Sequence, residues 1–226
     1  MKDYAIIVAG GKGTRMNSTV SKQFLSLKEL PVLMHTINAF YDYSPNIYII
    51  LVLPSDEIEV WQQLCLKYNY ERPVAIVAGG VSRFQSVKNG LSSIRSKEGL
   101  VAIHDGVRPL VGKDIIGASY RLAAVHKSAV AAVRLKESIR ITDQDTTRAV
   151  DRSNYRLIQT PQTFDLHLIK KAYEIKEEAS LTDDASVAEK SGHKISLFEG
   201  SYSNINITTP EDFLLIKKAM VNGFIC

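Results

Sequence analysis

Short apolar runs rich in β-branched residues recur along the chain, and more polar segments separate them. Stretches with the period of an amphipathic helix lie between most of these runs. Strands that alternate with helices form parallel sheets with helices on both faces, so the pattern predicts a three-layer α/β/α fold with a mainly parallel sheet. The runs that we expect to form strands are Ala5–Val8, Ile47–Leu53, Val74–Val77, Val101–Ile103 and Ala129–Val133.

Two helix starts are marked by local sequence signals. Pro31 suits the first turn of a helix that extends through Phe40. Ser82 and Gln85 have the spacing of a capping box, and a helical apolar period follows them. We therefore expect one helix after the first strand and another after the third.

One segment departs from this alternation. From Val133 to Thr142 the odd positions are mostly apolar and the even positions are polar, which is a strand pattern rather than a helical one. The polar residues 143–147 can turn the chain into a second strand from Ala149 to Ile158, which predicts an inserted β-hairpin arm at residues 134–159. An isolated hairpin is marginal in water, so its apolar face needs a partner, and a second copy of the chain is the simplest candidate.

Composition narrows the class of protein. With 226 residues, 45% of them hydrophobic, the chain can bury a sizeable core, and we expect residues 1–226 to form a single domain. The net charge of +4 favours anionic partners such as phosphates. Cys65 and Cys226 are far apart, which argues against a disulfide framework. No secretion signal or membrane-spanning run is evident, so we expect a soluble, cytoplasmic protein with no membrane partner.

A glycine-rich turn follows the first predicted strand. Glycines let backbone N–H groups approach an anion, and nearby Lys12, Arg15 and Lys22 concentrate positive charge suited to a triphosphate. The turn does not fit the dinucleotide pattern, because Met16 stands where its third glycine belongs. No Gly-Lys-Ser/Thr tripeptide of a Walker A loop occurs either. The turn is Ala9-Gly10-Gly11-Lys12-Gly13-Thr14-Arg15-Met16.

Further motifs follow this turn in a fixed order along nearly the whole chain. They are Ser21-Lys22-Gln23-Phe24, Gly79-Gly80-Val81-Ser82-Arg83-Phe84-Gln85-Ser86-Val87, His104-Asp105-Gly106-Val107-Arg108-Pro109, Val150-Asp151-Arg152, Thr160-Pro161-Gln162-Thr163-Phe164, Thr182-Asp183-Asp184-Ala185-Ser186 and Thr208-Thr209-Pro210-Glu211-Asp212. Each motif is modest alone. In this order and spacing, they resemble the 2-C-methyl-D-erythritol 4-phosphate cytidylyltransferase family.

The resemblance implies a Rossmann-like nucleotidyltransferase fold and an in-line reaction. A phosphate oxygen of 2-C-methyl-D-erythritol 4-phosphate attacks the α-phosphorus of CTP, and pyrophosphate leaves. The family pattern makes Arg15 and Lys22 the catalytic residues, which stabilise the transition state. It also implies Mg²⁺ carried chiefly by the triphosphate, with no certain metal ligand in the chain, and a homodimer in which the 134–159 arm completes the neighbouring site.

The resemblance also assigns binding residues. The nucleotide-binding set is Ala9, Gly10, Gly11, Gly13, Thr14, Gly79, Gly80, Arg83, Ser86 and Gly106. The substrate-positioning set is Asp105, Arg108, Ser138, Arg152, Thr160, Thr182 and Asn206. We expect small residues near the cytosine so that the main chain can reach the base. We expect Asp105 to bind a substrate hydroxyl or a bridging water, and Arg152 to hold the acceptor phosphate.

Two positions depart from the family pattern. Val81 stands where an acidic residue is common, so any ribose or base contact from that side chain is lost. Asn206 stands where the family usually has lysine, so the acceptor site lacks a positive charge. Charge-assisted hydrogen bonds are roughly twice as strong as neutral ones, so we expect weaker binding of the acceptor.

Other functions remain open at this stage. Ribitol 5-phosphate cytidylyltransferases share these motifs and differ in the acceptor. A nicotinamide-dependent oxidoreductase is disfavoured by the failed dinucleotide pattern. A nucleic-acid-binding module is disfavoured because basic and aromatic residues do not interleave in clusters, so we expect no nucleic-acid partner.

Overall fold

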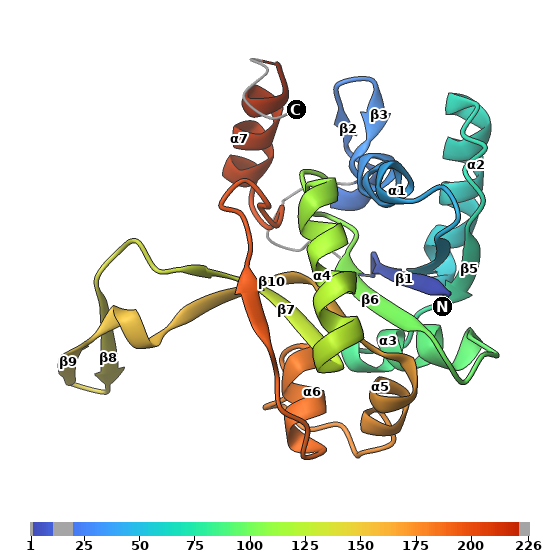
Figure 1. Cartoon of the computed structure of the whole chain (residues 1–226). Coiled ribbons are helices and arrows are strands. Elements are labelled where there is room, and N and C mark those ends of the chain that lie inside the picture. Colours follow the sequence, from blue (N-terminus) through green and yellow to red (C-terminus); the bar gives the residue numbers. More distant parts are fainter. Residues whose placement is uncertain (1, 11–19, 222–226) are drawn as a thin grey trace.

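A seven-stranded sheet forms the centre of the protein in a computed structural model, which describes residues 2–10 and 20–221 (Figure 1). Its strand order is β11-β7-β10-β6-β1-β4-β5. Strand β10 runs antiparallel to both of its neighbours, and the other pairings are parallel. The strands are β1 (Asp3–Val8), β4 (Tyr48–Leu53), β5 (Ala75–Ala78), β6 (Leu100–Asp105), β7 (Ser128–Arg134), β10 (Arg156–Asp165) and β11 (Leu197–Glu199).

Helices cover both faces of this sheet and bury its apolar side chains. One face packs against α1 (Val32–Tyr43), α2 (Ile58–Tyr68) and α4 (Lys113–His126), and the other against α3 (Arg83–Ser93), α5 (Leu166–Ala172) and α6 (Asp184–Lys190). A third apolar cluster joins α7 (Pro210–Val221) to the small hairpin of β2 (Ser26–Leu27) and β3 (Leu30–Pro31). The predicted α/β fold is therefore confirmed.

The predicted elements are present with small shifts at their ends. All five expected strands lie in the central sheet, and α1 begins directly after Pro31. The Ser82 hydroxyl caps α3 by accepting a hydrogen bond from the Gln85 backbone N–H at 3.0 Å. The Gln85 side chain donates instead to Asn89 at 3.0 Å, so only half of the expected capping box forms.

The inserted arm is more broken than the sequence pattern predicts. Its outer part is a separate two-stranded sheet of β8 (Ile139–Asp143) and β9 (Thr146–Val150), joined by a two-residue turn. Polar residues at 146–147 thus belong to a strand and not to the turn. The short helix η4 (Arg152–Asn154) interrupts the predicted return strand before β10 begins. Figure 1 shows this arm projecting away from the central sheet.

The sheet topology brings the motifs that follow β1, β5 and β6 to the same edge of the central sheet. Strands β1, β5 and β6 are parallel members of the sheet, so their carboxyl ends lie at the same edge. The arm leaves from the carboxyl end of β7 and returns into β10 at that edge. In the described part of the chain, no helix has the length and apolar character needed to span a membrane.

Candidate active site

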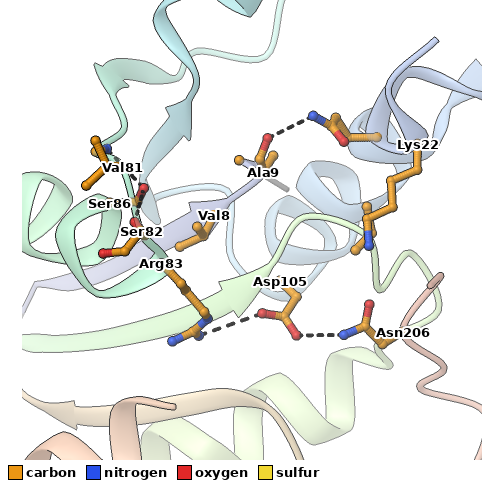
Figure 2. Close-up of a pocket in the computed structure, with 13 residues that line it drawn as sticks. Val8, Ala9, Lys22, Val81, Ser82, Arg83, Ser86, Asp105 and Asn206 are labelled. Atoms are coloured by element: carbon orange, nitrogen blue, oxygen red, sulfur yellow. Dashed lines mark hydrogen bonds and ion pairs between the residues drawn. The ribbon is translucent and has the colours of Figure 1, made fainter. Parts of the chain in front are cut away.

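A cavity of about 270 Å³ opens where the carboxyl ends of β1, β5 and β6 meet. Figure 2 shows residues from separate parts of the chain facing it, with Lys22 and Asn206 on one side and Ser82 and Arg83 on the other. The residues that line it are Val8, Ala9, Gly10, Lys22, Gln23, Gly80, Val81, Ser82, Arg83, Ser86, Asp105, Val107 and Asn206. Eight of the residues expected to bind or react with substrate therefore share one cavity: Ala9, Gly10, Lys22, Gly80, Arg83, Ser86, Asp105 and Asn206.

Buried Gln23 fixes the segment that carries Lys22. The Gln23 side-chain amide donates to the carbonyl oxygen of Ala9 at 2.9 Å and to Glu57 at 2.6 Å. These bonds tie the helix η2 (Lys22–Phe24) to the end of β1. The Lys22 ammonium group donates to the carbonyl oxygen of Ile207 at 2.8 Å. Its charge is therefore held at the wall of the cavity beside the C-terminal segment.

The second glycine-rich motif forms a tight turn around the Ser86 hydroxyl. The Gly80 N–H donates to the Ser86 hydroxyl at 3.1 Å, and this hydroxyl donates to the Ser82 carbonyl oxygen at 2.8 Å. A Cβ added at Gly80 would lie only 2.1 Å from the Gln85 side chain. Glycine is thus required here by the start of α3 as well as by any approach of a base. The Val81 side chain is fully exposed at the rim.

Asp105 is the centre of a polar network at the end of β6. Its carboxylate accepts from Arg108 at 3.0 Å and from the Asn206 amide at 3.2 Å, and lies 3.7 Å from Arg83. Burial raises the pKa of Asp105, but the nearby charges of Arg83 and Arg108 outweigh it and lower the pKa overall. The carboxylate therefore stays ionised and presents a negative charge at the cavity.

A second cavity of about 290 Å³ lies on the other side of this network. Arg83 and Asp105 belong to the walls of both cavities. The pairing of β10 with β7 is irregular between Ile158 and Gln162, and within this interval the Thr160 hydroxyl accepts from the Asp105 N–H at 3.1 Å. Four of the predicted positioning residues line this second cavity: Asp105, Arg108, Thr160 and Thr182. The full lining is Arg83, Asp105, Arg108, Ile158, Gln159, Thr160, Gln162, Thr182 and Asp183.

Four predicted residues line neither of these two cavities. Gly79 and Gly106 lie behind the first, and a Cβ at Gly106 would be 2.8 Å from that of Ala9. Gly106 is thus required for close packing against Ala9. Ser138 and Arg152 are exposed on the arm, where the Arg152 guanidinium donates to the Lys136 carbonyl oxygen. The predicted residues Gly11, Gly13, Thr14 and Arg15 lie outside the described residues.

Some residues that organise the site were not assigned a role from the sequence. Asp184 accepts two hydrogen bonds from the Arg83 guanidinium, at 2.7 and 3.0 Å. Asn204 is fully buried, donates to the Thr160 carbonyl oxygen at 2.7 Å, and its own carbonyl oxygen accepts from Arg108 at 2.8 Å. Both residues stand in or beside quoted motifs, but their partners are far away in sequence.

Comparison with solved structures places the fold among nucleotidyltransferases. A 4-diphosphocytidyl-2C-methyl-D-erythritol synthase from Anaerococcus prevotii aligns with a TM-score of 0.82 at 28% identity, covering 97% of this chain and 98% of the other. The enzyme from Francisella tularensis named 2-C-methyl-D-erythritol 4-phosphate cytidylyltransferase gives a TM-score of 0.78 at 29% identity, covering 96% and 99%. The site and fold together define an enzyme of the nucleotidyltransferase class.

Sequence comparison identifies the family. The model of the family described as 2-C-methyl-D-erythritol 4-phosphate cytidylyltransferase matches residues 4–222, and the chain belongs to this family. A curated protein of that name from Porphyromonas gingivalis is 48% identical over 219 residues, covering 96% of both chains. Another from Bacteroides thetaiotaomicron is 45% identical over 212 residues, covering 94% of this chain and 96% of the relative.

His104 lies beneath the site and is not placed to act as a base. Its side chain is fully buried, its ring packs edge-on against Phe40 at 5.1 Å, and its Nε2 lies 3.4 Å from the Arg108 carbonyl oxygen. Burial lowers the pKa of His104 to about 4, although the charge of Asp105 acts in the opposite direction. The imidazole is therefore neutral at pH 7 and serves as a packing residue.

The neutral state of His104 makes stability depend on pH. In the unfolded chain the His104 imidazole has its ordinary pKa of about 6.5. Between pH 6.5 and 4 this imidazole is therefore mostly protonated in the unfolded chain and mostly neutral in the folded one. Stability should fall as the pH falls through this window. We expect the free energy of unfolding to drop by about 2 kcal/mol more in the native protein than in His104→Leu between pH 7 and 4.5. Denaturant titrations that give parallel pH curves for the two proteins would contradict this assignment.

Proposed function

We propose that the protein transfers the cytidylyl group of CTP to 2-C-methyl-D-erythritol 4-phosphate and releases pyrophosphate, a step in isoprenoid precursor synthesis. The observation that carries this proposal is the cavity in which the end of β1, the Gly80 turn, Lys22 and Asp105 meet. Family membership and full-length relatives of that name support the choice of reaction. Because CTP is a cytoplasmic metabolite, we expect the reaction to take place in the cytoplasm.

The reaction is an in-line displacement at phosphorus. An oxygen of the acceptor phosphate forms a bond to the α-phosphorus of CTP. The bond from that phosphorus to the bridging oxygen breaks, and pyrophosphate leaves with the electron pair. The acceptor phosphate is already ionised at pH 7, so no general base is needed. Positioning and neutralisation of charge supply the catalysis, for which Lys22 lies at the cavity wall.

We infer that Mg²⁺ enters as part of the MgCTP substrate. Among the described residues, no group of three histidine, cysteine or acidic side chains is placed to hold a metal ion. Asp105 is the one carboxylate that the described residues contribute to the lining of the first cavity, and it is already paired with Arg108. Mg²⁺ commonly keeps several waters and binds substrate phosphates with only one or two carboxylates, which suits this arrangement. Asp105 would reach the ion directly or through water.

We assign the acceptor to the second cavity and to the arm of a partner subunit. Thr160, Thr182 and Arg108 offer hydroxyl and guanidinium groups in that cavity. Arg152 and Ser138 are carried on an arm that projects away from its own sheet. Exposed Ile141, Leu157 and Ile158 on or beside this arm favour a homodimer, because an unpartnered two-stranded sheet buries too little apolar surface.

The reaction is tested by pyrophosphate release from CTP and Mg²⁺, with 2-C-methyl-D-erythritol 4-phosphate and D-ribitol 5-phosphate offered in separate reactions. We expect turnover with the first acceptor and at least a 10-fold lower kcat/KM with the second, about 1.4 kcal/mol of discrimination. Preference for ribitol 5-phosphate would keep the chemistry and overturn the acceptor. Release with neither acceptor would contradict the proposed reaction.

Because Asn206 is neutral, we expect this protein to bind the acceptor more weakly than a variant with lysine at this position. The Asn206 amide donates to Asp105 at 3.2 Å, so the side chain reaches the shared wall of the two cavities. We expect Asn206→Lys to lower the KM for the acceptor by about 3- to 10-fold, because a charged donor replaces a neutral one. Steady-state kinetics at saturating CTP measure this effect. An unchanged KM and kcat would show that Asn206 does not contact the acceptor.

Subunit complementation tests whether the arm serves a neighbouring site. Lys22→Ala and Arg152→Ala should each be nearly inactive, with losses of about 100-fold or more for Lys22→Ala. After unfolding and refolding together in equal amounts, half of the dimers are mixed and each mixed dimer has one intact site. We therefore expect recovery of roughly a quarter of the wild-type rate. No recovery from a mixture shown to contain mixed dimers would mean that the arm serves its own subunit.

A further inference from the structure

Arg83 lies between two carboxylates that come from different elements. Its guanidinium donates two bonds to Asp184, at 3.0 and 2.7 Å. The nearest Asp105 oxygen lies 3.7 Å from Nη2, one of the two nitrogens that donate to Asp184, and is beyond hydrogen-bond distance. Arg83 begins α3, Asp184 begins α6 and Asp105 ends β6. The guanidinium is therefore bound closely by one carboxylate and held just short of the other.

Asp184 is itself fixed by its surroundings. Its side chain is fully buried, and it accepts a hydrogen bond from the Tyr173 hydroxyl at 2.5 Å. Tyr173 is buried too, and its ring packs on Phe84, the residue after Arg83, with ring centres 4.7 Å apart. Asp184 lines neither of the two cavities, so it does not touch a ligand there. The hydrogen bonds of Asp184 to Arg83 are its direct link to a residue that lines both cavities.

The position of Arg83 decides how much of Asp105 remains available. Both residues line both cavities, and Asp105 is already paired with Arg108 at 3.0 Å. Among the described residues, Asp105 is the other carboxylate that this guanidinium approaches, so a guanidinium released from Asp184 would be drawn to it and would form a close charge-assisted hydrogen bond to its Oδ1. That bond would occupy Oδ1 of Asp105, which the substrates or their Mg²⁺ need because Oδ2 already accepts from Arg108 and Asn206.

We propose that Asp184, supported by Tyr173, is a positioning residue that holds Arg83 away from Asp105 and so keeps Asp105 available at the wall between the two cavities. This inference rests on the proposed function for its effect on turnover. Its structural part stands without that function. A purely structural pair that docks α6 against α3 would stabilise the fold in the same way but would leave Asp105 unaffected when removed.

Three variants separate these roles. Asp184→Asn removes the negative charge, Tyr173→Phe removes only the hydroxyl, and Asp184→Glu keeps the charge. We expect kcat/KM for the acceptor to fall about 10- to 100-fold in Asp184→Asn and about 3- to 10-fold in Tyr173→Phe. Asp184→Glu should recover most of the loss. The KM for CTP should rise as well, because Arg83 and Asp105 also line the first cavity.

A fall in activity because the variant unfolds must be distinguished from a fall because Arg83 has moved. Removing one partner of a buried pair should lower the melting temperature of Asp184→Asn by about 10 °C, so each variant is assayed well below its own transition. Glu178→Gln is the matched control. In the wild-type protein, Glu178 pairs at 3.1 Å with Lys190, the last residue of α6, and both side chains are about half exposed. Glu178→Gln removes this ion pair. We expect its kinetics to stay within about 2-fold of wild type.

A crystal structure of Asp184→Asn tests the inference without any turnover. We expect the separation of Arg83 from Asp105 to shorten from 3.7 Å to about 2.8 Å. The proposal would be overturned if Arg83 kept its wild-type position in this crystal structure. It would also be overturned if Asp184→Asn and Tyr173→Phe were fully folded and had wild-type kinetics. If the wild-type protein releases no pyrophosphate with either acceptor, the proposed function fails, and the crystal structure still decides the position of Arg83.

Discussion

A carboxylate that is largely removed from water must be paired, and the pairing of Asp105, whose side chain is 20% exposed, organises most of this site. Its partners arrive from α3, from the turn after β6 and from the C-terminal segment. Leaving such a charge unpaired costs several kcal/mol. The ion pairs and hydrogen bonds to Asp105 therefore hold these segments at the end of β6, in addition to apolar packing. The same network forms the wall between the two cavities. The fold thus places one carboxylate in the walls of both cavities, where we propose that the nucleotide and the acceptor bind.

Periodicity and glycine patterns predict the fold because they report local constraints. The Ile47–Leu53 run is buried on both faces and reads clearly as a central strand, and β4 occupies nearly the same residues. The position of Asp105 at the strand end follows from the buried run before it. The arm follows from alternation, although its breaks at residues 135–138 and at η4 have no clear pattern in the sequence.

Long-range pairing explains what the sequence could not reveal. Arg83 and Asp184 are 101 positions apart, and nothing local in either motif indicates that they meet. Gln162 and Asp183 are likewise joined only by the fold, at 2.9 Å. The antiparallel course of β10 could not be predicted either, because its apolar pattern is the same for both directions. A motif indicates which residues matter, but the topology decides which of them touch.

Strand β10 also restricts where this protein can change its length. It leaves the arm, pairs with β7 through Ile158, and places Thr160 against Asp105 within two further residues. An inserted or deleted residue there would turn every following side chain to the opposite face of the sheet. The two-residue turn between β8 and β9 has no such register to keep with the central sheet. Length variation among arms should therefore accumulate at residues 144–145, while the path from the arm to the second cavity keeps a fixed length.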